Sequence, residues 1–159
     1  MSGELISYLI DTGTVERIAG HLAKCDAYFV PTLSSRVVLP DYALKICTDA
    51  VRFEAWSDDV LVGLVAAYCN DRERFHAYIT SVSVLKEWTG GGVATRLLLN
   101  CVEYAKLHGL RRLSLEVASG HASAIRLYEK CGFLVGETSG PFIKMNLDLE
   151  TREAHEHQA

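Results

Sequence analysis

Three consecutive glycines, at positions 90–92, connect a stretch that alternates apolar and polar residues to a stretch with helical apolar spacing. The alternation predicts a strand over 77–84, and the apolar stripe predicts a helix over 92–108. Glycines at this junction leave a turn of bare backbone N–H groups at the positive end of a helix. No acidic residue between Glu87 and Glu103 offsets that positive end. The turn is therefore predicted to bind an anion, above all a phosphate.

Two common nucleotide-binding motifs do not fit this turn. A P-loop requires Lys and then Ser or Thr directly after its last glycine, whereas Val93 and Ala94 follow here. The dinucleotide fingerprint requires spaced glycines and an acidic residue at the end of the next strand; Glu116 falls near that place, but the glycines are contiguous. A tight strand-to-helix connection is the structural alternative, and one glycine suffices for it. Three in a row favour close approach of a ligand to the backbone.

The remaining pattern alternates strands with helices. We expect strands over 4–10, 51–56, 60–68, 77–84, 112–117, 133–136 and 142–149, and helices over 15–24, 40–50, 92–108 and 122–131. Residues 26–40, with Pro31 and Pro40, are expected to be irregular. This order predicts a mixed sheet covered by helices in a single domain, 1–150, followed by a polar tail, 151–159.

The composition of the chain limits the binding partners and the cellular compartment that we expect. The chain of 159 residues carries a formal net charge of −4 and no long basic run, so nucleic acid is not expected as a partner. No apolar stretch is long enough to span a bilayer, and no secretory leader is recognisable. Five cysteines without a Cys-x-x-Cys pair indicate a reducing cytoplasm, and neither zinc nor a redox dithiol is expected. His155 and His157 lie in the polar tail, where a metal site needs two further ligands, so no metal is expected.

The glycine turn and a second motif resemble the coenzyme A signatures of the GNAT superfamily of N-acetyltransferases. The first signature is a strand followed by the motif Arg/Gln-x-x-Gly-x-Gly/Ala. In this chain Gly92 and Ala94 match the last two fixed positions of the motif, and Thr89 replaces the Arg or Gln. Residues 115–133 resemble the second, a strand and a loop ending in Asn before Ala-x-x-Leu-Tyr-x-x-x-Gly-Phe, with His121 in place of Asn. Two motifs in this order are more specific than either alone. The resemblance implies the GNAT acyl-CoA N-acyltransferase fold, an α/β fold whose mixed, mostly antiparallel central sheet is splayed at strands 4 and 5 and flanked by helices.

The resemblance implies that acetyl-CoA binds as a co-substrate. Its pyrophosphate is expected on the N–H groups of 89–95, with hydroxyl contacts from Thr89 and Thr95, and its pantetheine arm along 82–84 like an added strand. His121 is either a helix cap or a contact to that arm. Arg126 or Lys130 either meets an outer phosphate or is a solvated helix residue. The predicted cofactor-binding residues are Val82, Ser83, Val84, Thr89, Gly90, Gly91, Gly92, Val93, Ala94, Thr95, His121 and Tyr128.

Tyr128, the tyrosine of the second motif, is the predicted catalytic residue. The resemblance implies that it protonates the departing thiolate of CoA; a phenol has a reference pKa of about 10, against about 8.5 for a thiol. The alternative is an ordinary core tyrosine on the helical stripe. A backbone N–H near Ser83 or Val84 is expected to polarise the acetyl carbonyl. The general base stays open among Glu116, Glu54 and His76.

The resemblance implies an acetyl-CoA-dependent N-acetyltransferase that acts directly on a primary amine, without a covalent enzyme intermediate. The acceptor is expected to be a small molecule, and Arg36 is placed to hold its carboxylate or phosphate. Three alternatives stay open: a non-catalytic acyl-CoA-binding sensor or scaffold, a protein N-terminal or lysine acetyltransferase, and an enzyme for a larger acyl group. A homodimer also stays open.

Overall fold

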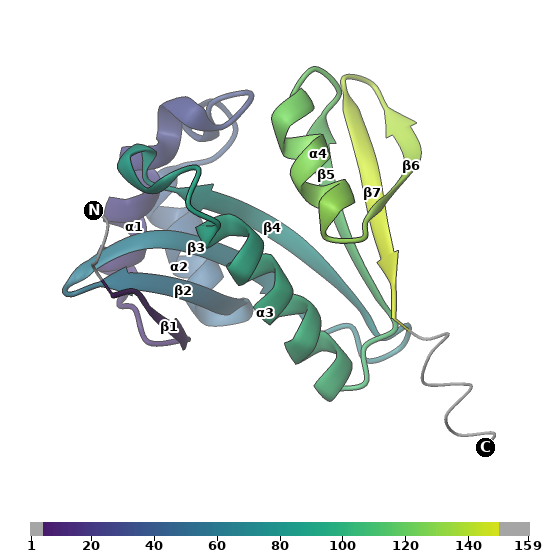
Figure 1. Cartoon of the computed structure of the whole chain (residues 1–159), viewed down its shortest axis with the longest axis horizontal. Helices are drawn as coiled ribbons and strands as arrows, with labels where there is room; N and C mark the ends of the chain where they lie inside the picture. The colour runs from purple at the N-terminus through teal and green to yellow at the C-terminus, as the bar shows by residue number, and fades with distance from the viewer. Residues whose placement is uncertain (1–4, 150–159) are drawn as a thin grey trace.

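The computed structural model describes residues 5–149, which form one seven-stranded sheet with helices on both faces (Figure 1). The sheet order is β1-β2-β3-β4-β5-β7-β6, and β4 with β5 is its parallel pair. The elements are β1 (Ser7–Ile10), α1 (Val15–Cys25), η1 (Asp26–Tyr28), η2 (Leu33–Ser35), α2 (Leu39–Asp49), β2 (Val51–Ser57), β3 (Val60–Tyr68), β4 (His76–Val84), η3 (Lys86–Trp88), α3 (Val93–Leu107), β5 (Arg112–Ala118), α4 (Ala122–Lys130), β6 (Leu134–Ser139) and β7 (Phe142–Asp148). No helix within 5–149 combines the length and the apolar character needed to cross a membrane.

The predicted α/β architecture is confirmed, with most element boundaries shifted by one to three residues. The first strand begins at Ser7, later than expected, and residue 4 lies outside the described part. The strand expected over 133–136 continues to Ser139, because the last two strands pair through a register shift. Two short 3₁₀ helices, η1 and η2, interrupt the stretch expected to be irregular. The tail 151–159, with His155 and His157, lies outside the described residues.

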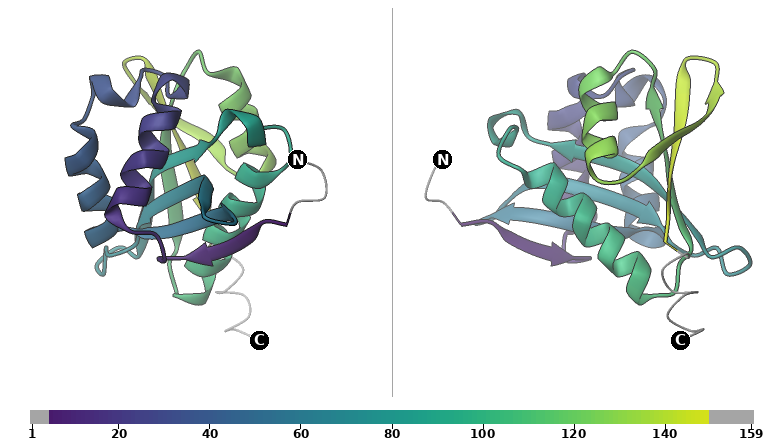
Figure 2. Two further views of the ribbon diagram at one scale, coloured as in Figure 1. Left: turned by 90° about the vertical axis from the view of Figure 1, so that its left-hand side faces the viewer. Right: turned by 45° about the vertical axis from the view of Figure 1, so that its right-hand side comes forward.

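Helix α3 packs on one face of the sheet, and α1 and α2 pack on the other (Figure 2). The apolar stripe of α3 is buried, and its first turn lies against β3. A Cβ added at Gly63 would lie 2.8 Å from Cγ1 of Val93, so the glycine permits this close approach. The approach fixes the N-terminus of α3, and with it the glycine turn, over the middle of the sheet.

The sheet opens between β4 and β5. Parallel pairing joins only 76–78 to 112–114, beyond which the two strands diverge and leave the V-shaped opening seen in Figure 1. A register shift between β3 and β4 places one extra residue at Thr80, a β-bulge. The N–H of Leu85 donates to the Val62 carbonyl at 2.8 Å, so the main chain of Leu85 points toward β3. Main-chain groups alternate in direction along a strand, and those of Val82 and Val84 therefore point away from β3 and into the opening.

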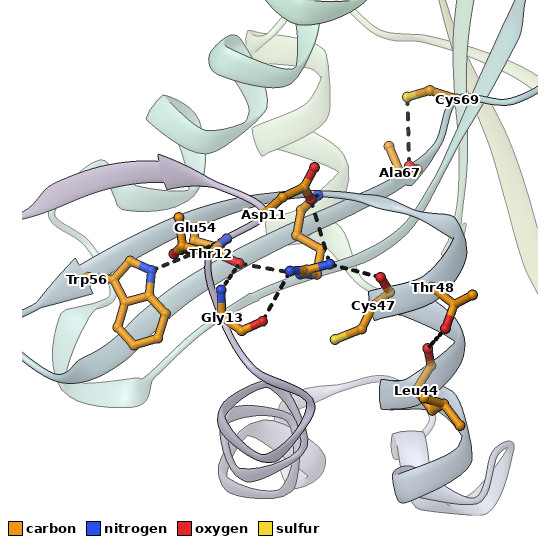
Figure 3. Close-up of polar contacts among 11 residues, drawn as sticks. Asp11, Thr12, Gly13, Leu44, Cys47, Thr48, Glu54, Trp56, Ala67 and Cys69 are labelled. Carbon is orange, nitrogen blue, oxygen red and sulfur yellow. Dashed lines mark hydrogen bonds and ion pairs between the residues drawn. The ribbon is translucent and has the colours of Figure 1, made fainter.

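A buried polar cluster holds the connection between β1 and α1 (Figure 3). The Glu54 carboxylate, which is fully buried, accepts hydrogen bonds from the N–H and hydroxyl of Thr12 at 3.1 and 2.6 Å and from the N–H of Gly13 at 3.0 Å. The indole of Trp56 donates at 3.0 Å, and Nε of Arg52 lies 3.4 Å away. These donors use the acceptor capacity of both carboxylate oxygens. The cluster therefore anchors the start of α1.

Candidate active site

The glycine turn presents backbone donors at the N-terminus of α3. Gly90 and Gly92 adopt left-handed φ angles of 82° and 87°, and a Cβ at either position would meet nothing within 4 Å. Gly92 caps a helix whose first turn has no acidic residue. The first bond of the helix runs from Arg96 N–H to the Gly92 carbonyl, which leaves the N–H groups of the first turn without acceptors inside the helix. The turn therefore has the geometry of an anion site.

Thr89 departs from the expected role in this turn. Its hydroxyl donates to the carbonyl of Lys86 at 2.8 Å, and its N–H is directed to the same oxygen at 3.3 Å. Both donors thus close η3, and a contact from the Thr89 hydroxyl to a phosphate stays a prediction. The donors available to an anion begin at Gly90.

Two cavities meet in the opening. The first, which we call the glycine-turn cavity, has a volume of ≈ 230 Å³ and is lined by residues that include Val84, Thr89 and Leu127. The second, the Arg36 cavity, has a volume of ≈ 130 Å³. The residues common to both linings are Tyr28, Phe29, Val82, His121, Ala124 and Tyr128. Two ligands that entered from the two sides would therefore meet beside Tyr128.

Comparison with known families decides where this arrangement belongs. The model of the acetyltransferase (GNAT) family matches residues 17–133, which include both motifs and the elements around the opening. This chain belongs to the GNAT family.

Individual relatives support the same family. An uncharacterized N-acetyltransferase of Methanocaldococcus jannaschii is 33% identical over 88 residues, which cover 53% of this chain and 39% of the relative. An N-alpha-acetyltransferase of Arabidopsis thaliana is 28% identical over 83 residues, or 52% of this chain and 44% of the relative. The matches thus span less than half of these two relatives.

A solved structure shares the GNAT fold. The crystal structure of the PaiA N-acetyltransferase from Thermoplasma acidophilum in complex with coenzyme A superposes with a TM-score of 0.72 at 17% identity, over 90% of this chain and 99% of that one. This likeness confirms the predicted fold, including the sheet splayed at β4 and β5.

Tyr128 of this GNAT chain lies at the junction of the two cavities. Its side chain is buried and packs edge-to-face on Phe133, with ring centroids 6.2 Å apart. Burial raises the pKa of Tyr128 to about 12, and Cys131 nearby acts in the same direction. The phenol therefore keeps its proton at neutral pH and can act as an acid. Tyr128 thus packs in the core and also lines both cavities, and its role as the catalytic acid stays a prediction.

His121 and the two basic residues of α4 differ in position. His121 is the N-cap residue of α4, although its side chain makes no capping hydrogen bond, and it lines both cavities. Its contact to the cofactor arm stays a prediction. Arg126 and Lys130 are exposed and line neither cavity. Their contact to an outer phosphate stays a prediction.

Of the three candidate bases, only Glu116 lies in the opening. It lines the Arg36 cavity from β5. Glu54 is enclosed by the donors of the β1–α1 connection. His76 pairs with Arg112 at the closed end of the V, where β4 and β5 meet, and lines neither cavity. These positions argue against Glu54 and His76, two candidates that the sequence left open.

A histidine–serine pair that the sequence did not reveal borders the glycine-turn cavity. Nδ1 of His21 lies 2.9 Å from the Leu61 carbonyl, and Nε2 lies 2.9 Å from the Ser83 hydroxyl. Because a carbonyl only accepts, Nδ1 carries the proton, and Ser83 must donate to Nε2. Burial lowers the pKa of His21 to about 4, so the ring is neutral at pH 7. The pair thus fixes the Ser83 hydroxyl as a donor to His21, and Ser83 also lines the glycine-turn cavity.

The cysteines are protonated thiols. All five are free, and burial raises the pKa of each, to about 11 in Cys25 and Cys69. A thiol that holds its proton is a poor nucleophile. This supports the expectation of direct transfer.

Proposed function

We propose that this protein transfers an acetyl group from acetyl-CoA to the primary amine of a small molecule. The observation that carries this proposal is the meeting of two cavities at Tyr128, one bordered by the glycine turn and the other by charged side chains. Membership of the GNAT family and the coenzyme A bound in the related structure support the choice of cofactor. The family match also supports our proposal that 1–150 form one domain with a tail at 151–159.

The opening offers the cofactor two kinds of backbone contact. We assign the pyrophosphate to the N–H groups of 90–95, where the positive end of α3 favours negative charge. We assign the pantetheine arm to the main-chain groups of Val82 and Val84, which face the opening like an unpaired strand edge. Ser83 contributes through its side chain instead, since its main chain pairs with β3.

Each chemical step has a residue in place. Glu116 takes a proton from the acceptor ammonium, directly or through water, so that a neutral amine attacks the thioester carbonyl. The N–H of Val84, rather than that of Ser83, points into the opening and stabilises the developing oxyanion. The C–N bond forms, the C–S bond breaks, and the Tyr128 phenol gives its proton to the leaving thiolate. The second proton of the attacking nitrogen then returns to the Tyr128 phenolate, directly or through water, which leaves a neutral amide and restores the phenol.

Acetylation of protein N-termini is the second candidate, because a curated relative is an N-alpha-acetyltransferase. The two candidates differ in the group attached beyond the reactive amine. A peptide continues out of the Arg36 cavity, whereas a small acceptor ends within it. Short peptides therefore belong in the substrate panel beside free amines.

Thiol release from acetyl-CoA in the presence of that panel tests the activity. We expect Tyr128→Phe to lower kcat by about 100-fold or more, since general acid catalysis typically contributes 10²–10⁴-fold. Tyr104→Phe is the matched control and should retain turnover, because Tyr104 packs edge-to-face on Phe53 and lines neither cavity. Unchanged kcat in Tyr128→Phe would remove this residue from the mechanism. Tight binding of acetyl-CoA without turnover of any amine would instead support the sensor or scaffold.

Heat protection by CoA tests the glycine turn separately. Gly92→Leu places a side chain on the anion site, so we expect CoA to lose most of its effect on Tm. Gly109→Leu is the matched control, because Gly109 has a similar φ of 74° at the other end of α3 and equally open surroundings. Both variants carry similar backbone strain. Equal protection of both by CoA would place the cofactor elsewhere.

A further inference from the structure

The Arg36 cavity contains one cationic and one anionic side chain that face a common space. We infer that the acceptor is a zwitterion, a primary amine that also bears a carboxylate, and that Arg36 binds this carboxylate. The inference rests on the proposed function and narrows its substrate to amino acids and similar compounds.

The two charges lie on different walls of the cavity. Arg36 follows η2, and Glu116 belongs to β5 across the opening. Tyr78 of β4 interacts electrostatically with both charges. Burial raises the pKa of Tyr78, the negative charge of Glu116 raises it further, and the positive charge of Arg36 lowers it. Within residues 5–149 neither Arg36 nor Glu116 forms an ion pair. A ligand with charges of both signs therefore supplies both missing counter-ions.

A buried hydroxyl on the same wall also lacks a partner. Ser81 is 4% exposed and lines the cavity, and its Oγ makes no hydrogen bond with any described residue. The neighbouring tyrosine is unavailable, because the Tyr42 hydroxyl is already bonded to the carbonyl and hydroxyl of Thr80 at 2.9 and 2.7 Å. Leaving a buried hydroxyl without a hydrogen bond is unfavourable. A polar acceptor in this cavity relieves that penalty, whereas an apolar amine does not.

The reaction fixes which end of the acceptor lies where. The amine must reach the junction of the cavities, beside Tyr128, and lose its proton to Glu116. The carboxylate then extends toward Arg36, the single Lys or Arg among the residues that line this cavity within 5–149. One guanidinium matches one carboxylate in a bidentate pair. A phosphate with two charges would lack a second cation.

Paired substrates test the inference directly. Amino acids are compared with their own carboxamides, and kcat/KM is measured for each pair in the wild type and in Arg36→Gln. The amine of a carboxamide is intrinsically more reactive than that of the parent amino acid. This difference is the same for both proteins, so it cancels when the ratio of kcat/KM for the acid to kcat/KM for its carboxamide is compared between the wild type and Arg36→Gln. We expect Arg36→Gln to lower that ratio about 10- to 100-fold, as for loss of a hydrogen bond between charged groups. Arg36→Lys should restore part of it.

Controls separate this inference from the proposed function. Arg72→Gln removes an exposed arginine that lines neither cavity and should leave the ratio unchanged. CoA heat protection reports folding and cofactor binding in every variant. An unchanged acid-to-carboxamide ratio in Arg36→Gln overturns the inference. The inference also fails if CoA protects the wild type from heat but no amino acid is acetylated, whether the enzyme acetylates peptides or carboxamides instead or no amine at all. Absence of CoA protection in the wild type overturns the proposed function first, and the inference with it.

Discussion

The molecule contains two arginine–glutamate sets that differ in how far their charges are satisfied. In the β1–α1 connection, Arg52 and Glu54 are buried, contact each other, and bind backbone or side-chain partners throughout. In the opening, Arg36 and Glu116 are exposed to a shared cavity and form no ion pair within residues 5–149. The same residue types thus serve structure where their charged groups are buried and bonded within the protein, and are available for binding where they are not. Variants that alter one set and spare the other test this contrast.

Glu54→Ala should give the largest change in stability. It would leave the guanidinium of Arg52 without its buried partner and remove an acceptor from Thr12, Gly13 and Trp56. Breaking a buried charge pair in this way typically costs about 3–5 kcal/mol, measurable as a lower urea midpoint. Glu116→Gln is the matched control and should change the free energy of unfolding by no more than about 0.5 kcal/mol. Similar losses in both variants would refute the contrast.

His21 extends the contrast to pH. Its pKa is about 4 in the folded protein, against a reference of about 6.5 when unfolded, so the unfolded chain takes up a proton first as pH falls. Stability from this group is fully present above pH ~6.5 and is lost as pH falls toward ~4, by up to about 3 kcal/mol.

Unfolding curves across this pH window check the sign. The fall in stability should be shallower in His21→Asn, with His108→Asn, which alters an exposed histidine at the end of α3, as the control. Parallel pH profiles for the wild type and His21→Asn would mean that His21 is not the group that titrates.

The sequence predicts the helices, strands and turns well, but it predicts poorly which charged side chains are bonded within the protein. The glycine turn and the helix after it were predictable because period and turn chemistry are local properties, whereas Tyr128 was proposed only through the resemblance to the family motif. Glu54 and Glu116 are indistinguishable by pattern, since each is an acidic residue between apolar neighbours on a strand. Their partners separate them, because Glu54 is held by residues about 40 positions away.

The parts of the site that the sequence did not reveal depend on long-range contacts. His21 and Ser83 are 62 residues apart, and no local signal connects them. The N–H and the hydroxyl of Thr89 both donate to the Lys86 carbonyl because residues 86–88 form a 3₁₀ turn, which the sequence pattern did not predict. The bulge at Thr80 likewise depends on the register between β3 and β4. Local pattern therefore identified the cleft, and tertiary contacts decided which of its polar groups are free to bind.

Two buried serines provide the finest test of the contrast. Ser81 and Ser114 are 4% and 6% exposed, but Ser114 donates to Oδ1 of Asn146 at 2.8 Å, whereas Ser81 Oγ has no partner in the described part of the chain. Ser114→Ala should cost about 1 kcal/mol of stability and leave the KM of the acceptor unchanged. Ser81→Ala should leave stability within about 0.5 kcal/mol and raise that KM about five- to tenfold, because its hydroxyl bonds only when the acceptor is present. Loss of stability without a change in KM in Ser81→Ala would mean that this hydroxyl serves the fold, and the distinction between satisfied and available groups would then fail at its most closely matched pair.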